Sequence, residues 1–274
     1  MWEKPMTAQL AQHNSKNESI RWYALIGFYP DMHQILFRSI KGHNVWPLYV
    51  KTALDGLLEH SPYIVELFEN DEIISTLPKE QMLLFSASTK INARQVVDHL
   101  RQRMTIIFDG NKKGLLHYYQ PEIASYFFSA NSNDTENWLG LLTGVQWFNQ
   151  IAGQESEWLS INNEGHSEQS NDWFLTPAQE EKLNQQWVDK LIAQWAQAEQ
   201  VAYVDWDRLR SVYSLSEQLD ITQLNDVKRI FSFVNGSTKA IPNFSEEMSD
   251  IRTLSDSQKV DLLETRMKDI NHVS

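Results

Sequence analysis

Apolar positions in the first half of the chain form short runs, rich in β-branched and aromatic residues, that alternate with stretches of helical spacing. Short apolar runs are typical of buried strands, whereas apolar residues three and four positions apart favour an amphipathic helix. The pattern predicts strands at Trp22–Phe28, Val45–Leu48, Tyr63–Glu66 and Met82–Ala87, and helices at Met32–Ile40 and Glu122–Phe128. We expect these elements to form a lobe with a mixed β-sheet and flanking helices.

The segment that ends at Pro121 predicts a helix followed by a β-hairpin. Asn92 is a favourable N-cap, and helical spacing relates the apolar residues after it, Val96, Val97, Leu100 and Met104. Two strand-like runs follow, Thr105–Phe108 and Leu115–Tyr119, and the polar stretch between them contains a glycine near each end. A turn of that composition joins two antiparallel strands, and Pro121 is expected to end the second one.

The pattern becomes helical in the second half of the chain. Thr176 and Gln179 form a capping box, Pro177 takes the favoured first helical position, and apolar residues recur at every fourth position, Leu183, Trp187, Leu191 and Trp195. We expect Trp187 and Trp195 to be buried on one face. Further helices are predicted at Thr222–Val234, before Asn235-Gly236, and after a cap formed by Ser255 and Gln258, with the apolar residues Val260, Leu263, Met267 and Ile270.

Two polar stretches interrupt the pattern. Asn131 to Asp134 marks a polar break, and Ser160 to Asn171 is expected to be an exposed loop. The fold class is therefore α+β, with a polar N-terminal segment at 1–19, an α/β lobe at 20–150 and an all-helical lobe at 151–274.

Composition and charge limit the classes of partner that we expect for this protein. The chain has 274 residues, no cysteine and a net charge of −12; residues 1–130 contain 13 basic and 13 acidic side chains, and the remainder contains 11 and 23. Such an acidic surface repels phosphate backbones, so nucleic acid is not an expected partner; a basic protein partner fits better, and plain solubility is the alternative. Neither a signal peptide nor a membrane-spanning run is visible, so we expect no membrane association and a cytoplasmic location.

The first half of the chain contains several short phrases in a specific order. They begin with Tyr23-Ala24-Leu25 and continue with Pro47-Leu48-Tyr49 and Pro62-Tyr63-Ile64-Val65-Glu66-Leu67. Later phrases are Phe85-Ser86-Ala87-Ser88, His99-Leu100-Arg101, Asp109-Gly110, His117-Tyr118-Tyr119-Gln120-Pro121 and Gly144 to Trp147. Their order resembles the effector-adaptor (effector-chaperone) domain of bacterial type VI secretion systems, the VasW-like family, and the resemblance covers about residues 20–150. It implies that twelve of these residues are structural or partner-binding: Tyr23, Pro62, Tyr63, His99, Leu100, Arg101, Asp109, Gly110, His117, Tyr118, Tyr119 and Pro121.

The chain departs from the family pattern at three positions. His117 and Gln120 stand where the family has an arginine and an aspartate, and Gly27 stands where it has an acidic residue. An ion pair expected in relatives would be a weaker polar contact here. His117 could also titrate near neutrality, although a structural substitution is the simpler interpretation.

Known catalytic motifs are missing. The sequence lacks G-x-S-x-G, H-E-x-x-H, a P-loop and a dinucleotide-binding glycine fingerprint, and its histidines show no metal-ligand spacing, so no cofactor or metal is expected. A hydrolytic triad could still assemble, with Ser86 or Ser88 as nucleophile, His99 as base and Asp98 or Asp109 as orienting group. We expect His99 to pack beside the sheet instead, and the protein not to be an enzyme.

The resemblance implies a non-catalytic adaptor that binds a toxin effector and loads it onto the VgrG spike. Trp158 and Trp173 flank the predicted polar loop and are candidate interface aromatics; packing under that loop is the alternative. Two other functions stay open, namely an immunity protein that neutralises a toxin and a hydrolase-type effector.

Overall fold

The computed structural model describes residues 10–14, 16–29, 32–69, 71, 73–108, 111–163, 172–237, 241–242 and 248–269. The chain forms two compact units, Met1–Leu183 and Asn184–Ser274. We call the second one the helical unit. No helix within the described ranges combines the length and the apolar character that crossing a membrane requires.

Two sheets form the first unit. The larger has six strands in the order β2-β3-β1-β4-β7-β8, all paired antiparallel: β1 (Ile20–Ile26), β2 (Val45–Pro47), β3 (Tyr63–Glu66), β4 (Met82–Ser88), β7 (Leu142–Phe148) and β8 (Trp158–Asn162). The smaller has the order β6-β5-β9: β5 (Thr105–Phe108), β6 (Lys112–Leu115) and β9 (Trp173–Phe174). Because β9 runs parallel to β5 while β6 runs antiparallel to it, the mixed pairing lies in this smaller sheet.

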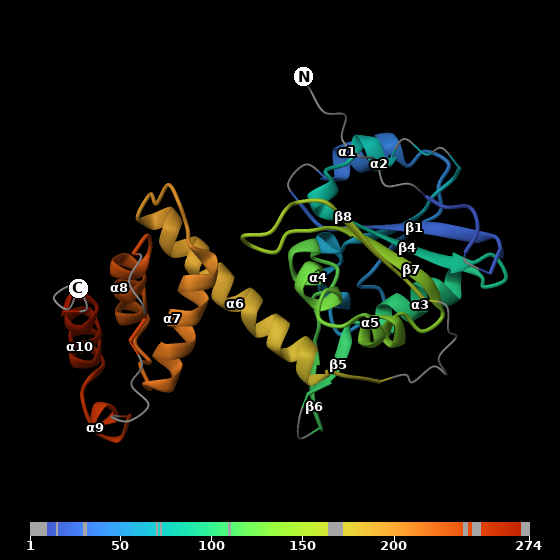
Figure 1. Ribbon diagram of the computed structural model, residues 1–274. Coiled ribbons are helices and arrows are strands. Elements are labelled where there is room, and N and C mark those ends of the chain that lie inside the picture. The colour runs from blue at the N-terminus through green and yellow to red at the C-terminus, as the bar shows by residue number, and fades with distance from the viewer. Residues whose placement is uncertain are drawn as a thin grey trace. The chain divides into compact units, whose positions relative to one another are not determined.

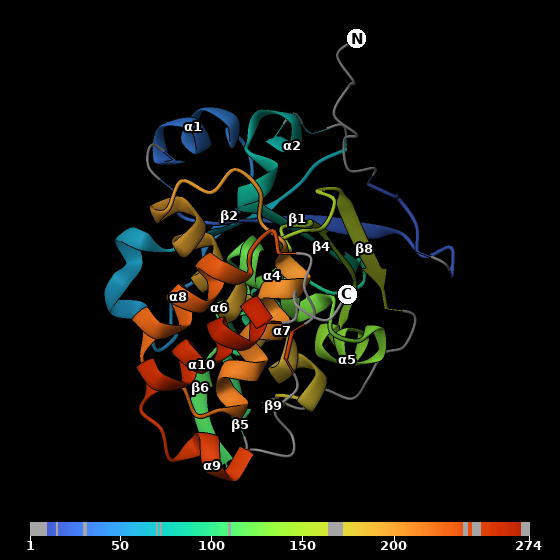
Figure 2. The ribbon, with the colours of Figure 1, turned by 60° about the vertical axis from the view of Figure 1, so that its left-hand side comes forward.

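Helices cover both faces of the larger sheet. The first unit contains α1 (Met32–Ser39), η1 (Asp55–His60), α2 (Ile73–Thr76), η2 (Lys79–Gln81), α3 (Ala93–Gln102), α4 (Pro121–Phe128) and α5 (Ser132–Leu139). Both views show α1 and α2 together on one side of the sheet, and Figure 1 shows α3, α4 and α5 on the other side (Figures 1 and 2). The α+β fold class predicted from the sequence is confirmed.

Alternation along the central strands explains these layers, because successive strand side chains point to opposite faces. Tyr23 and Leu25 of β1 belong to the larger buried cluster, with residues of α3, α4 and α5. Trp22, Ala24 and Ile26 belong to a second cluster with residues of α1 and α2. β1 thus contributes to two cores.

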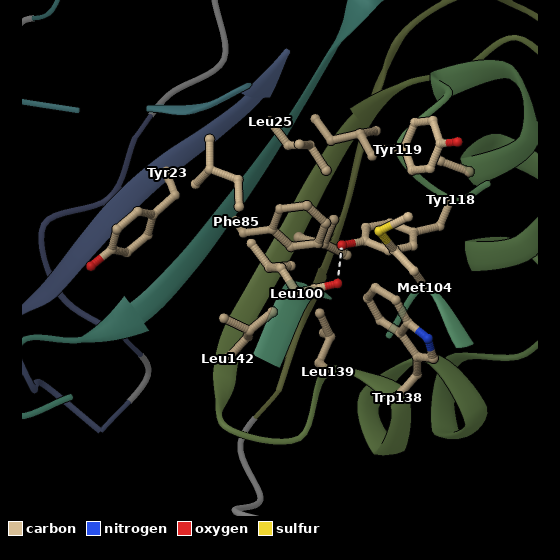
Figure 3. Packing of buried hydrophobic residues seen from close by; sticks show 14 of the residues in the cluster. Tyr23, Leu25, Phe85, Leu100, Met104, Tyr118, Tyr119, Trp138, Leu139 and Leu142 are labelled. Atoms are coloured by element: carbon tan, nitrogen blue, oxygen red, sulfur yellow. Dashed lines mark hydrogen bonds between the residues drawn. The ribbon is translucent and has the colours of Figure 1, made fainter. Parts of the chain in front are cut away.

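Aromatic side chains fill the larger core (Figure 3). Trp138 of α5 lies 4.8 Å from the ring centroid of Tyr118 and 5.2 Å from that of Phe128. The Tyr118 hydroxyl donates a hydrogen bond to the carbonyl oxygen of Leu100 at 2.6 Å, which satisfies its one polar atom in this apolar surrounding. The hairpin exit is therefore fixed to the end of α3.

The helical unit consists of the greater part of α6 (Pro177–Ala198), which begins in the first unit, with α7 (Trp206–Gln218), α8 (Leu224–Val234), α9 (Met248–Arg252) and α10 (Asp256–Asp269). Trp195 packs on Phe231 with ring centroids 5.7 Å apart, inside a core of aliphatic side chains. Asp189 of α6 receives two hydrogen bonds from Arg210 of α7, at 2.7 and 2.8 Å. Apolar packing and one buried ion pair thus join these helices.

Most predicted elements are present, and the capping box at Asn92 is formed with Gln95. The second hairpin strand was predicted wrongly: it is Lys112–Leu115, and the segment up to Tyr119 leads into α4 instead. Pro121 is the first residue of α4 rather than the end of a strand.

The polar stretches also differ from the prediction. Asn131 is not part of a break; its side chain accepts hydrogen bonds from the first turn of α5 and caps that helix. The first residues of the predicted loop form β8, and residues 164–171 of that loop lie outside the described residues, as does Ile270 of the last predicted helix face. The division between the units falls after Leu183, later than the expected 150, because β8 and β9 pair with strands of the first unit.

Candidate functional site

The antiparallel order of the large sheet brings four strand ends to one edge. Ile26, the last residue of β1, pairs with Tyr63 at the start of β3 and with Met82 at the start of β4. The end of β7 reaches the same edge, since Leu83 pairs with Trp147. The segments that follow or precede these four ends therefore meet at this edge.

A pocket of about 360 Å³ lies there, which we call the strand-end pocket. It is lined by residues from the ends of the strands, Gly27, Phe28, Pro62, Glu80, Gln81 and Gln150, by Tyr49 and His60, and by the hairpin exit, Tyr119, Gln120, Pro121 and Glu122. Three of the twelve positions implied by the resemblance are in this lining: Pro62, Tyr119 and Pro121. Two of the three departures, Gly27 and Gln120, also line it.

Tyrosines form the inner wall of the strand-end pocket. The Tyr49 hydroxyl donates to the Tyr119 hydroxyl at 2.9 Å, and the two rings meet edge to face with centroids 5.6 Å apart. The Tyr119 hydroxyl is in turn hydrogen-bonded to Nδ1 of His117. The Tyr119 hydroxyl accepts from Tyr49 and can donate its own proton to Nδ1 of a neutral His117.

The local electrostatics favour this arrangement. Burial lowers the pKa of His117 below its ordinary value, which favours the neutral form of the ring. Burial, with the hydrogen bond from Tyr49, raises the pKa of Tyr119 far above its ordinary value. The Tyr49–Tyr119–His117 chain is therefore an uncharged polar network.

Hydrogen bonds to the backbone hold the segments around the strand-end pocket. Arg101 donates from Nη2 to the carbonyl of Pro47 at 2.9 Å and from Nε to that of Leu48 at 3.3 Å. The Ser61 hydroxyl accepts from the Tyr49 amide at 3.0 Å. Phrases that lie far apart in the sequence thus contact one another, which explains why they occur together in the resemblance.

The rim of the strand-end pocket is acidic and aromatic. Glu80 and Glu122 are exposed, and Phe28, 43% exposed, lies edge to face against His60 at 5.1 Å. The lining includes neither lysine nor arginine. An aromatic surface with carboxylates at its edge attracts a cationic side chain, through the ring faces and through direct charge pairing.

Several other positions implied by the resemblance contribute to the buried clusters. Tyr23, Leu100 and Tyr118 are buried in the larger core, and Tyr63 packs half-buried against the cluster of the opposite face. His99 is also buried, and burial and the nearby Arg103 lower its pKa to about 3. Asp109 and Gly110 lie outside the described residues.

The proposed hydrolytic constellation is not assembled among its described members. The Ser86 hydroxyl accepts from Thr143 at 2.8 Å, and the Ser88 hydroxyl accepts from the Lys90 amide at 3.3 Å. The His99 ring is hydrogen-bonded to the backbone of Leu139, and its Nε2 has no partner. Asp98 pairs with Arg101 at 3.3 Å. No described serine–histidine contact joins these groups, and a histidine with so low a pKa is a weak base.

The two candidate interface aromatics are half-buried. Trp158 lies 6.0 Å from Phe148, and Trp173 donates from its ring nitrogen to Gln179 at 3.0 Å, below the guanidinium of Arg103 at 5.5 Å. Both rings therefore contribute to packing within the first unit. The described residues contain no group of three histidines or carboxylates placed to hold a metal ion.

Sequence reasoning missed Phe28, His60, Glu80 and Gln150 of the strand-end pocket. Each follows or precedes a strand end, and no motif marks them, since the sheet topology alone brings them together. Phe28 was expected inside a strand, but β1 ends at Ile26.

Residues 22–137 match a domain family described as "Domain of unknown function (DUF4123)". This family is associated with effector adaptors of type VI secretion systems. The match ends before β7, so it contains most of the strand-end pocket and none of the helical unit. Comparison with the curated proteins and comparison with the solved structures each found no match.

Proposed function

We propose that this chain is a non-catalytic adaptor of the VasW-like kind, which binds a toxin effector in the cytoplasm and loads it onto the VgrG spike of a type VI secretion system. The observation that carries the proposal is the match over residues 22–137, the part of the chain that builds the tyrosine wall of the strand-end pocket.

The strand-end pocket supports the proposal by its chemistry. Its aromatic wall and the exposed carboxylates of Glu80 and Glu122 suit a protein segment that carries a lysine or arginine beside apolar residues. We assign this pocket to the spike or to the N-terminal segment of the effector. The helical unit, which lies outside the family match, would then determine which effector the protein binds.

The test is a secretion experiment in the bacterium that produces the protein. Its gene is deleted, and the secreted proteins are compared with those of the parent by quantitative mass spectrometry. Loss of one toxin from the medium, with the other secreted effectors unchanged, is the expected result. Reintroduction of the wild-type gene should restore secretion of that toxin.

A matched pair of variants tests the strand-end pocket itself. A Cβ on Gly27 would lie 3.4 Å from its nearest neighbours, at the lower limit of ordinary contact, and Gly27 lines the pocket, so the side chain of Gly27→Leu would occupy space at the pocket. A Cβ on Gly56 meets nothing within 4 Å, which makes Gly56→Leu the control. We expect the first variant to fail in restoring secretion and the second to succeed.

Other outcomes would favour the competing functions. Death of the deletion strain with unchanged toxin secretion would identify an immunity protein. Toxicity of the chain expressed alone in a foreign host, relieved by His99→Ala or Ser86→Ala, would identify an enzyme and overturn the adaptor proposal.

A further inference from the structure

The helical unit exposes a tryptophan that the sequence pattern predicts to be buried. Trp187 of α6 is 54% exposed, whereas Trp195, two turns further along the same helix, is 3% exposed. The prediction for Trp187 was wrong because every fourth position drifts around a helix of 3.6 residues per turn. Isolated exposed apolar residues are common, so Trp187 alone indicates nothing.

Its surroundings distinguish Trp187 from a solitary surface residue. A pocket of about 320 Å³, which we call the Trp187 groove, lies between α6, α7 and α8, and its apolar wall includes Trp187, Tyr213, Ile221 and Leu224. The Tyr213 ring meets Trp187 edge to face, with centroids 5.7 Å apart. Leu224, the first residue of α8, is 46% exposed. Aromatic and aliphatic side chains around a hollow are the usual anchors of a protein interface.

The charges of the Trp187 groove have one sign. Its only charged lining residues are Glu217 and Asp220. Glu217 is hydrogen-bonded to Tyr213, whose pKa burial and this carboxylate raise to about 12, so the phenol remains a donor. No described basic side chain forms an ion pair with Glu217. Asp220 pairs with Arg252 at 3.2 Å, yet its side chain is 63% exposed.

A partner must match both the apolar wall and the negative rim. A polyanion is repelled by the carboxylates, and an uncharged apolar segment would leave Glu217 without a cation in a partly dry contact. A lysine or arginine next to a large apolar side chain satisfies both features.

We infer that the Trp187 groove is a docking site for a protein segment in which a large apolar side chain is flanked, within one helical turn, by lysine or arginine. The apolar side chain lies against Trp187, Tyr213 and Leu224, and the cation faces Glu217 and Asp220. This inference rests on the helical unit alone and does not require the proposed function.

The probe is a phage-displayed library of random peptides selected on the full-length chain. Peptides that are enriched are synthesised with a fluorophore, and their affinities are measured by fluorescence anisotropy. We expect them to carry a leucine, phenylalanine or tryptophan close to a basic residue, and to bind at least ten-fold more weakly to Trp187→Ala and to Glu217→Lys. Because Trp187 and Glu217 line an open surface, far-ultraviolet circular dichroism should show both variants folded.

Tyr203 provides the matched control. It is 70% exposed, belongs to the same unit and does not line the Trp187 groove, so Tyr203→Ala should leave the affinity unchanged. Peptides in which the lysine is replaced by glutamate should bind the wild-type chain weakly and the Glu217→Lys variant more tightly. A purely apolar contact would not predict this reversal.

The inference is overturned by enriched peptides that bind Trp187→Ala as well as the wild type, by peptides without a basic residue, or by the absence of any enriched binder. The peptide selection contains neither spike nor toxin, so its result does not depend on the proposed adaptor function. A secretion test that contradicts the adaptor function would therefore leave the result of the peptide selection valid.

Discussion

The hydroxyl of Tyr49 donates a hydrogen bond to the hydroxyl of Tyr119 at 2.9 Å, across 70 positions of the sequence. This contact joins the segment after β2 to the hairpin exit and forms the wall of the strand-end pocket. It also continues to His117, so three residues share one chain of hydrogen bonds.

Removal of either hydroxyl should therefore affect the stability of the first unit. Tyr119→Phe leaves Tyr49 and His117 without their partner and should lower the free energy of unfolding by about 1–3 kcal/mol, while Tyr49→Phe removes one bond and should cost about 1 kcal/mol. Urea unfolding of both single variants and of the double variant measures the coupling free energy between the two hydroxyls. Since the two bonds share an atom, the double variant should cost less than the sum of the single ones; additivity within about 0.3 kcal/mol would mean that the hydrogen bond contributes nothing.

His99 should make stability depend on pH. Its pKa is about 3 in the folded chain and 6.5 without the fold, so between these values the unfolded chain binds the extra proton. Stability from this residue is complete above pH 6.5 and is lost as the pH falls towards 3, by up to about 1.4 kcal/mol per pH unit.

The measurement is the slope of the unfolding free energy between pH 7 and pH 4. His99→Phe preserves much of the ring volume and removes the titrating nitrogens, so its slope should be shallower than that of the wild type. His13 is exposed, which makes His13→Gln the control with an unchanged slope. Equal slopes in the wild type and in His99→Phe would show that protonation of His99 does not lower the free energy of unfolding.

The buried ion pair of the helical unit should matter far more than an exposed one. Asp189 is 3% exposed and accepts two hydrogen bonds from Arg210. Asp189→Ala leaves the guanidinium partly buried without its main partner and should cost about 3–5 kcal/mol. Asp261→Ala breaks the exposed pair with Arg229 and should cost at most about 1 kcal/mol. Similar losses in thermal unfolding would contradict this assignment.

The sequence predicted those elements whose burial follows local periodicity. β3 was predicted at its observed bounds, and α3 was predicted with its cap at Asn92. A short apolar run and a capped amphipathic helix can both be recognised from neighbouring residues in the sequence. α5 and β8 were missed because their polar residues, such as Asn131 and Ser160, are those of loops, and only tertiary pairing decides otherwise.

The strand-end pocket could be predicted only in part. Tyr119 and Pro121 followed from the resemblance, because they belong to one continuous phrase. Phe28 and Gln150 could not be found, since the antiparallel order β1-β4-β7 places them at one edge and the sequence does not state that order. For Trp187, the drift of every fourth position around α6 separates it from the side of the helix on which Trp195 is buried.

Gly114 of β6 offers a test of packing in the small sheet. A Cβ built on it would lie 2.2 Å from the ring of Phe108 in β5, so the ring covers the glycine across the strand pair. Gly114→Ala must push this 38% exposed ring into solvent. The loss of a cross-strand contact should lower the unfolding free energy by about 0.2–1 kcal/mol, although alanine is otherwise preferred to glycine in a strand.

In the background of Phe108→Ala the same substitution should become neutral or stabilising, because no ring remains to be displaced and alanine restricts the unfolded chain more than glycine does. Gly56→Ala, at a glycine with nothing within 4 Å of the added carbon, serves as the control for solvent-exposed space. Chemical denaturation of the four combinations at positions 108 and 114 measures the coupling. If Gly114→Ala had the same effect with and without the Phe108 ring, the ring would not be resting on Gly114 in solution, and the exposure of Phe108 would need another explanation.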